Sequence, residues 1–283
     1  MPIKDLLVHL DGSAQSRERL ELAIALAQRQ GAHLTALYIL DLIPAIEAIA
    51  KGYPDQVRYL ESYAALRKAS LDRASHVEAE FRERLRREEI IGEWRFLESL
   101  PAETIALHAR YADLTIVGQV DPENEPSGNA GRIPEEVLFS SGGPVLVVPY
   151  AGQFSSVGKN VLVAWKPTRE SARALRDALP ILEQAKKVTV LTVNPERGTD
   201  TEPGIPTADI AHHLAHHGIT VEAATTFADD ISTGDALLNH AADSGADLIV
   251  MGGYGHWRVK EMVVGGVTRQ ILRQMTVPVL MAH

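Results

Sequence analysis

The sequence predicts an α/β protein that consists of two repeated doubly wound domains, each a mainly parallel five-stranded sheet flanked by helices. Apolar runs alternate with helical patterns along the chain, and strands separated by helices imply a parallel sheet with helices on both faces. The apolar runs are rich in Val, Leu and Ile without strict alternation, as expected for strands buried on both faces. The same landmarks occur in each half, which indicates an internal repeat.

The repeat consists of four pairs of apolar runs that occur in the same order in each half. The first strand of each half is followed by a turn and then by a helical pattern. The pairs are LLVHLDGSAQS (6–16) with VLVAWKPTRES (161–171), AHLTALYIL (32–40) with KKVTVLTVN (186–194), ADLTIVGQ (112–119) with ADLIVMGG (246–253), and GPVLVVP (143–149) with VPVLMAH (277–283). Two copies of this length indicate two similar domains rather than a solenoid.

The second half shows its predicted elements most clearly. They are strands at 160–165, 187–193, 219–227, 247–252 and 278–282, and helices at 169–184, 207–217, 232–244 and 265–275. The first half has additional residues between its first and late strands, and these fall in a charged segment at 55–87 that predicts a long helix. The segment 149–159 contains Gly, Ser and Pro without periodicity and is the expected linker. We therefore expect domains at 1–150 and 157–283.

Composition limits the classes of function that are open to this chain. The 283 residues are 45% hydrophobic and 23% charged, as expected for a globular protein with a core. The net charge of −9 argues against a nucleic-acid partner, which normally needs a basic surface. The absence of cysteine excludes disulfides, cysteine-bound zinc and thiol nucleophiles. We find no signal peptide and no membrane-spanning run, so we expect a cytoplasmic protein without a membrane partner.

These features together resemble the universal stress protein family. The resemblance rests on a first strand that ends in LDGS, a late strand ADLIVMGG, a glycine-spaced loop and a closing VPVL, and it extends over nearly the whole chain. The nucleotide-binding branch of that family carries the motif Gly-x2-Gly-x9-Gly-Ser/Thr. Gly252, Gly255 and Gly265 match this spacing, but Gly266 stands at the Ser/Thr position.

The resemblance implies a tandem universal stress protein, which is a stress-response regulatory or protective module without strong catalysis. It also implies binding of ATP or a related adenine nucleotide in the C-terminal domain. The candidate nucleotide-binding residues are Ala164, Lys166, Val193, Gly252, Gly253, Gly255, Gly265, Gly266, Val267 and Thr268. The family uses an aspartate at the end of the first strand on the adenosine moiety. This residue is Asp11 in the first half, whereas the second half has Lys166 at that place.

The physical chemistry of the glycine loop agrees with an anion site. Ligands of doubly wound sheets bind at the carboxyl ends of the strands, where Gly252 is expected. Gly265 and Gly266 are expected at the start of the next helix, whose free N–H groups and dipole favour an anion. The alternative is a tight turn and a helix cap without a ligand. Lys166 is open to three interpretations: a phosphate contact, a pair with an acid, or a solvated side chain.

The first half keeps a different part of this site. Gly118 and Gly131 match two of the glycines, but Asp121 stands at the place of the third, and the loop adds Glu123 and a further glutamate. Acidic groups at this place would repel phosphates. We therefore expect a vestigial site in the first half, composed of Asp11, Gly118 and Gly131.

Four histidines occur in the segment ADIAHHLAHHG (208–218). His213 and His217 are four residues apart on one helical face, as are His212 and His216. Such a pair can hold a metal ion when a third ligand converges on it, which would favour a metal-assisted hydrolase of a small phosphorylated or acylated substrate. The sequence fixes no third ligand, although Asp209 is a possible one, so we expect no tightly bound metal and name His213 and His217 as the candidates. A dimerisation scaffold without a ligand is the third hypothesis.

Both halves end in a short and very apolar strand, PVLVVP in the first and PVLMAH in the second. Exposed sheet edges need to be paired or covered, and in the family such strands pair across a dimer. We predict that residues 144–148 and 278–282 pair with each other inside the chain, about a pseudo-two-fold axis. A homodimer of whole chains is left open.

Overall fold

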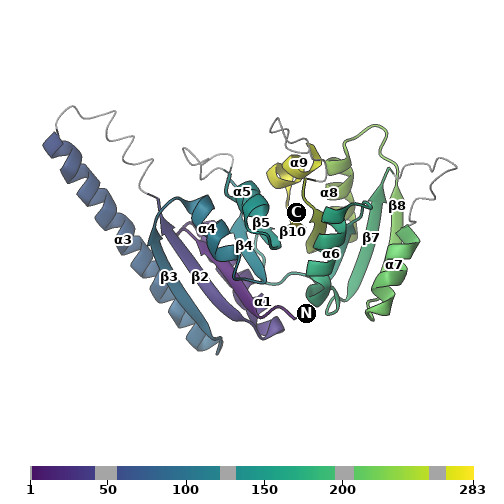
Figure 1. The fold of residues 1–283 in the computed structure, drawn as a ribbon, viewed down its shortest axis with the longest axis horizontal. Coiled ribbons are helices and arrows are strands. Elements are labelled where there is room, and N and C mark those ends of the chain that lie inside the picture. Colours follow the sequence, from purple (N-terminus) through teal and green to yellow (C-terminus); the bar gives the residue numbers. More distant parts are fainter. Residues whose placement is uncertain (1, 42–55, 122–131, 195–206, 255–265) are drawn as a thin grey trace.

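The computed structural model describes residues 2–41, 56–121, 132–194, 207–254 and 266–283, and its two halves repeat one order of elements (Figure 1). The first half contains β1 (Asp5–Leu10), α1 (Ala14–Gln30), β2 (His33–Leu40), α3 (Gln56–Arg87), β3 (Gly92–Glu98), α4 (Pro101–Ala109), β4 (Leu114–Gly118), α5 (Ile133–Ser140) and β5 (Val145–Val148). The second half contains β6 (Asn160–Ala164), α6 (Arg169–Leu182), β7 (Lys187–Val193), α7 (Thr207–His216), β8 (Val221–Thr226), α8 (Thr233–Ser244), β9 (Leu248–Gly252), α9 (Gly266–Gln274) and β10 (Val279–Ala282).

The strands form one continuous sheet in the order β3-β2-β1-β4-β5-β10-β9-β6-β7-β8. Neighbouring strands are parallel within each half, and both halves have the same internal order. The halves join where β5 pairs with β10 in the antiparallel direction, with Val147 opposite Val279 and Leu146 opposite Leu280. The predicted pairing of 144–148 with 278–282 is thus confirmed, and we refer to the β5–β10 pair as the seam.

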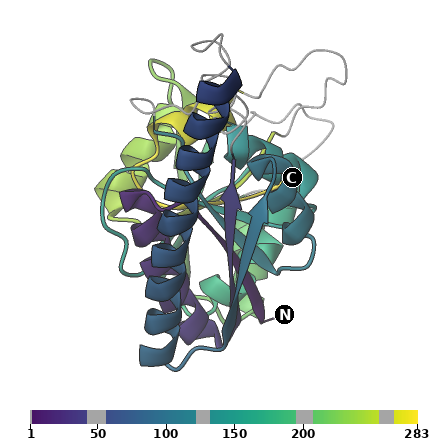
Figure 2. The same cartoon turned by 90° about the vertical axis from the view of Figure 1, so that its left-hand side faces the viewer.

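Helices cover both faces of this sheet, as the sequence predicts. Buried residues of α1, α3, α6 and α7 form the core on one face, and those of α4, α5, α8 and α9 form the core on the other. The long helix expected at 55–87 is α3, which Figure 2 shows running along the length of the outer strands of the first half. No helix in the described ranges is long and apolar enough to cross a membrane.

The aspartate of the repeated Ala-Asp-Leu motif fixes the strand order in each half. The side chain of Asp113 accepts hydrogen bonds from the backbone nitrogens of Lys4 (2.7 Å) and Asp5 (3.0 Å). Asp247 likewise accepts hydrogen bonds from the backbone nitrogens of residues 158–160, at 2.9 to 3.0 Å. Each aspartate therefore ties the start of the first strand to the start of the late strand. This arrangement places the carboxyl ends of both strands side by side, where a ligand can bind.

Candidate functional site

A cavity of about 220 Å³ lies at the carboxyl ends of the strands in the second half, and we refer to it as the C-half cavity. Seven of the predicted site residues line it: Ala164, Lys166, Val193, Gly252, Gly266, Val267 and Thr268. The structure thus brings together residues from β6, β7, β9 and α9. Gly253 is not among the lining residues, and it faces Leu138 across the seam instead. Gly255 and Gly265 lie outside the described residues.

One side of the C-half cavity is apolar. Its wall is formed by Ala164 at the end of β6, Leu191 and Val193 of β7, Leu237 of α8 and Met251 of β9. These side chains come from parallel strands that are neighbours in the sheet and from the helix that covers them. Such a surface suits a flat aromatic or aliphatic group rather than a charged one.

The opposite side of the C-half cavity is polar and is formed by the first residues of α9. Gly266, Val267 and Thr268 line it, and backbone N–H groups in a first helical turn have no partner within the helix. The Thr268 hydroxyl oxygen accepts a hydrogen bond from the backbone nitrogen of Tyr254 at 3.1 Å, and a hydroxyl that accepts one hydrogen bond can also donate one. Lys166 adds an exposed cation at the rim. This end of the cavity is equipped for an anion.

Gly252 serves close packing of the backbone. A Cβ atom at this position would lie 2.5 Å from the backbone nitrogen of Ser171 and 2.7 Å from the backbone carbon of Glu170. The first turn of α6 therefore rests directly on the end of β9. By contrast, among the described residues a Cβ atom at Gly266 would meet no atom within 4 Å apart from its chain neighbours. Gly252 and Gly266 thus differ in role, since α6 packs closely against the first and not against the second.

The sequence did not single out two buried residues that line the C-half cavity, Glu170 and Tyr254. Burial raises the pKa of the Glu170 carboxyl, but hydrogen bonds from Arg169 and Thr168 outweigh this effect and hold the pKa below its usual value. The Tyr254 ring stacks on Phe139 of α5 with a centroid distance of 4.3 Å, so the first half supports this wall of the cavity. That these two residues line the cavity is visible only in the folded structure, where elements distant in the sequence meet.

A second cavity, of about 520 Å³, lies at the corresponding place in the first half, and we refer to it as the N-half cavity. Asp11 and Gly118 line it, as predicted, whereas Gly131 lies outside the described residues. Its walls are much more polar than those of the C-half cavity. The other titratable residues that line it are His9, Arg19, Tyr38, Asp41, Arg73, Asp121 and Tyr150.

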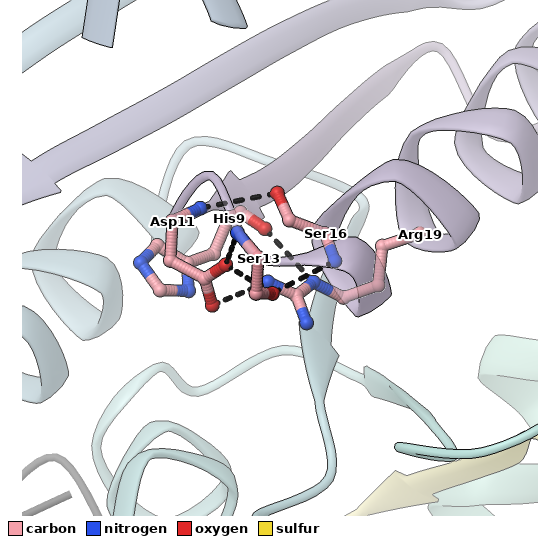
Figure 3. Close-up of polar contacts among 5 residues, drawn as sticks. All are labelled: His9, Asp11, Ser13, Ser16 and Arg19. Carbon is pink, nitrogen blue, oxygen red and sulfur yellow. Dashed lines mark hydrogen bonds and ion pairs between the residues drawn. The ribbon is translucent and has the colours of Figure 1, made fainter. Parts of the chain in front are cut away.

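Both carboxylate oxygens of Asp11 have partners within the protein, although the side chain is exposed (Figure 3). One carboxylate oxygen accepts hydrogen bonds from the backbone nitrogen (2.9 Å) and the hydroxyl (2.6 Å) of Ser13, and the other forms an ion pair with Arg19 at 2.7 Å. Desolvation raises the pKa of Asp11, but attraction to Arg19 and His9 outweighs it and holds the pKa below its usual range. The carboxylate that the family uses on adenosine is therefore already paired.

Arg19 also fills the crevice between the ends of β1 and β4. Its Nε donates to the backbone oxygen of His9 at 3.1 Å, and its guanidinium lies where a Cβ atom at Gly118 would be. In the second half the corresponding residue of α6 is Ala174, so no guanidinium fills the crevice there. These contacts support the expectation of a vestigial nucleotide site in the first half, which stays a prediction.

His9 makes the stability of the first half dependent on pH. Burial lowers the pKa of His9 from 6.5 to about 4; Asp11 opposes this shift and Arg19 adds to it. The unfolded chain binds a proton at this histidine below about pH 6.5, whereas the folded chain does so only near pH 4, so stability falls as the pH falls. Between pH 7 and pH 5 this group should reduce the free energy of unfolding by about 2 kcal/mol.

The substitution His9→Gln should remove that part of the pH dependence, which urea unfolding at pH 7, 6 and 5 would measure. The change His76→Gln at an exposed histidine of α3 is the control and should keep the slope of the parent chain. An unchanged slope in His9→Gln would show that burial of His9 does not couple folding to protonation.

The histidines of α7 and the adjoining His217 form two neighbouring pairs on an exposed surface. The ring centroids of His212 and His216 are 4.5 Å apart, and those of His213 and His217 are 5.0 Å apart. Within the described parts of the chain, no group of three or more His, Cys, Asp or Glu residues could hold a metal ion. The expectation that the purified protein contains no stoichiometric zinc stays a prediction, which elemental analysis can test.

Both halves of the chain match the model of one known family. Residues 2–149 and 158–283 each match the universal stress protein family. A universal stress protein of Synechocystis sp. (strain ATCC 27184 / PCC 6803 / Kazusa) is 24% identical over 297 residues, which cover 98% of this chain and 99% of the relative. The two-fold match and the length of this relative agree with the tandem arrangement seen in the fold.

Solved structures show the same fold over nearly the whole chain. A universal stress protein of Archaeoglobus fulgidus DSM 4304 matches with a TM-score of 0.72 at 18% identity, covering 98% of this chain and 95% of that one. A functionally unknown protein of Pseudomonas aeruginosa PAO1 matches with a TM-score of 0.56 at 15% identity, covering 98% and 92%. At these identities the structural matches establish the fold alone.

Proposed function

Because the chain belongs to the universal stress protein family, we propose that it is a tandem stress-response module that binds ATP or a related adenine nucleotide in residues 157–283. The observation that carries this proposal is the C-half cavity, in which an apolar wall faces the first turn of α9. A purine ring is flat and can be covered by apolar side chains, whereas a phosphate is an anion that a helix N-terminus favours. The two sides of the cavity suit the two ends of a nucleotide.

The residues of the C-half cavity divide into three roles. The apolar wall of Ala164, Leu191, Val193, Leu237 and Met251 would cover the base. The backbone N–H groups at the start of α9, the Thr268 hydroxyl and Lys166 would face the phosphates. The buried Glu170 carboxylate can accept hydrogen bonds from the hydroxyl groups of a ribose. This last role would replace the aspartate that the second half lacks at the end of its first strand.

The first half is proposed to act as a partner domain rather than as a second nucleotide site. Its aspartate is paired with Arg19, and the crevice between β1 and β4 is filled by the same guanidinium. We propose residues 1–150 and 157–283 as the two domains, joined through the seam, with a regulatory or protective role that follows nucleotide binding. A homodimer of whole chains and a cytoplasmic location belong to the same proposal.

A large side chain that fills the C-half cavity should weaken nucleotide binding. The same side chain in the N-half cavity should not. Ala164 is half-buried and lines the first, so the ring in Ala164→Phe would take the place of the base. Isothermal titration of the intact chain should give one ATP or AMP per chain, and Ala164→Phe should weaken binding at least about tenfold.

The matched control for this experiment is Gln15→Phe, which places the same ring in the N-half cavity. It should bind nucleotide as the parent chain does, and thermal melting should show that both variants are folded. Two nucleotides per chain, or a loss of affinity in Gln15→Phe alone, would place the nucleotide site elsewhere and contradict the proposal.

A further inference from the structure

The side chain of Gln119 holds α9 from the other half of the molecule. Gln119 follows directly after β4 and is only 6% exposed. Its Nε2 donates a hydrogen bond to the backbone oxygen of Leu272 in α9 at 3.0 Å, and its Oε1 accepts one from the backbone nitrogen of Tyr150 at 3.0 Å. If the amide were rotated by 180°, its nitrogen would face the backbone N–H of Tyr150 and its oxygen would face the backbone oxygen of Leu272. Only one orientation of the amide therefore makes both hydrogen bonds. Gln119 therefore binds α9 in one fixed orientation across the seam.

The position of α9 matters because its first turn is the polar side of the C-half cavity. Within its own half, α9 is held by Gln270, which accepts a hydrogen bond from the Ser232 hydroxyl at 2.7 Å and donates one to Asp235 at 2.9 Å. These contacts attach α9 to the beginning of α8. Gln119 supplies the attachment on the side of the seam, so that α9 is fixed from two directions.

We infer that Gln119 is a positioning residue for the phosphate side of the nucleotide site, so that the first half sets the geometry of the site in the second half. This inference rests on the proposed function for the identity of the ligand. Gln119 touches no part of the cavity that would hold the base, and it acts only through α9. Its effect should therefore depend on whether the ligand carries a phosphate.

The hydrogen bond from Gln119 to α9 has no counterpart at the equivalent position of the second half. The residue that corresponds to Gln119 after β9 is Gly253, which has no side chain that could hold α5 in return. A Cβ atom at Gly253 would lie 2.7 Å from Leu138 Cδ2, so the close packing of α5 leaves little room for one. The pseudo-symmetry of the fold is broken at this pair of positions, and the half with the candidate nucleotide site receives the additional hydrogen bond.

The chain offers a matched control for Gln119 on the opposite face of the sheet. Gln30 of α1 is 8% exposed, and its Nε2 donates to the backbone oxygen of Pro180 in α6 at 3.1 Å. This contact is also a buried hydrogen bond from a glutamine amide to a helical carbonyl across the two halves. It does not involve α9 or the residues that line the C-half cavity.

The experiment compares Gln119→Leu with Gln30→Leu in the intact chain, with adenosine and AMP as probes. In Gln119→Leu the affinity for AMP should fall about tenfold, as expected for lost positioning of anion donors, while the affinity for adenosine should change less than about twofold. Gln30→Leu should leave both affinities within about twofold of the parent chain. Hydrogen exchange measured without ligand should be at least about tenfold faster in α9 of Gln119→Leu than in α9 of Gln30→Leu.

Two results would overturn the inference. One is an equal loss of affinity for adenosine and AMP in Gln119→Leu, since a general disturbance of the fold would act on both. The other is equal exchange rates of α9 in the two variants, which would show that Gln119 does not hold the helix. If the parent chain bound neither these probes nor ATP, the proposed function would fail, and the exchange of α9 would still decide whether Gln119 positions this helix.

Discussion

The substitution Val147→Asp is expected to abolish stable folding of the chain. Val147 is 1% exposed in β5, lies opposite Val279 of β10, and is covered by helices on its face of the sheet. A carboxylate at this place would be buried without a partner, which typically costs about 3–5 kcal/mol. Since the whole free energy of unfolding of a domain is about 5–15 kcal/mol, such a loss removes most of it. Urea unfolding and size-exclusion chromatography would measure the loss of stability and the expected aggregation.

The seam can be tested from its other strand and from the edge of the sheet. Leu280→Lys should have a similar effect, because Leu280 is fully buried opposite Leu146 and faces the other core. The control is Thr225→Asp in the edge strand β8, where the side chain is exposed and the change should stay within about 0.5 kcal/mol. If the Val147→Asp chain unfolded at the same urea concentration as the parent chain, the buried pairing of β5 with β10 would be contradicted.

The substitution Gly252→Val is expected to destabilise the protein by about 2–3 kcal/mol and to abolish nucleotide binding. The new side chain would collide with the backbone of Ser171 and Glu170, which cannot move aside as a flexible side chain could. The first turn of α6 would have to leave the end of β9, and the cavity wall that Gly252 and Glu170 share would change shape. Urea unfolding and isothermal titration with ATP would measure the two effects.

The matched control is Gly266→Ala, where the added Cβ would have no neighbour within 4 Å among the described residues apart from those adjacent in the chain. Alanine is also a better helix former than glycine, so the free energy of unfolding should stay equal or rise by up to about 1 kcal/mol. Equal stabilities of Gly252→Val and the parent chain would show that α6 does not rest on Gly252. The comparison therefore separates the packing role of one glycine from the open position of the other.

Most of the fold could be predicted from the sequence because it depends on periodicity and on repetition. The seam could be predicted because each half ends in a short apolar strand whose edge needs a partner. The two strands pair with each other. The predicted bounds differ from the observed ones mainly at the ends of elements. The helix expected at 169–184 ends at Leu182, and the strand expected at 219–227 is Val221–Thr226. Terminal turns and strand ends have few hydrogen bonds, and sequence patterns define them poorly.

The sites were less predictable because their walls come from elements that are far apart in the sequence. The glycine motif located the carboxyl ends of the strands, but it gave no sign of the buried Glu170 or of Tyr254 stacking across the seam. The ion pair of Asp11 with Arg19 joins a strand end to a helix eight residues later, a spacing that no helical or strand pattern favours. Gln119 is a single polar residue after an apolar strand, and only its burial against α9 shows what it does.

The seam also affects how the chain folds during its synthesis. Every other strand of the first half has all its neighbours within that half, whereas β5 also pairs with β10 of the second half. At about 5–20 residues per second, β5 waits on the order of ten seconds before its partner leaves the ribosome. In this interval the four apolar residues Val145–Val148 form an open edge, to which strands of other nascent chains can add. The interface that unites the finished protein is therefore an unprotected edge while the protein is being made.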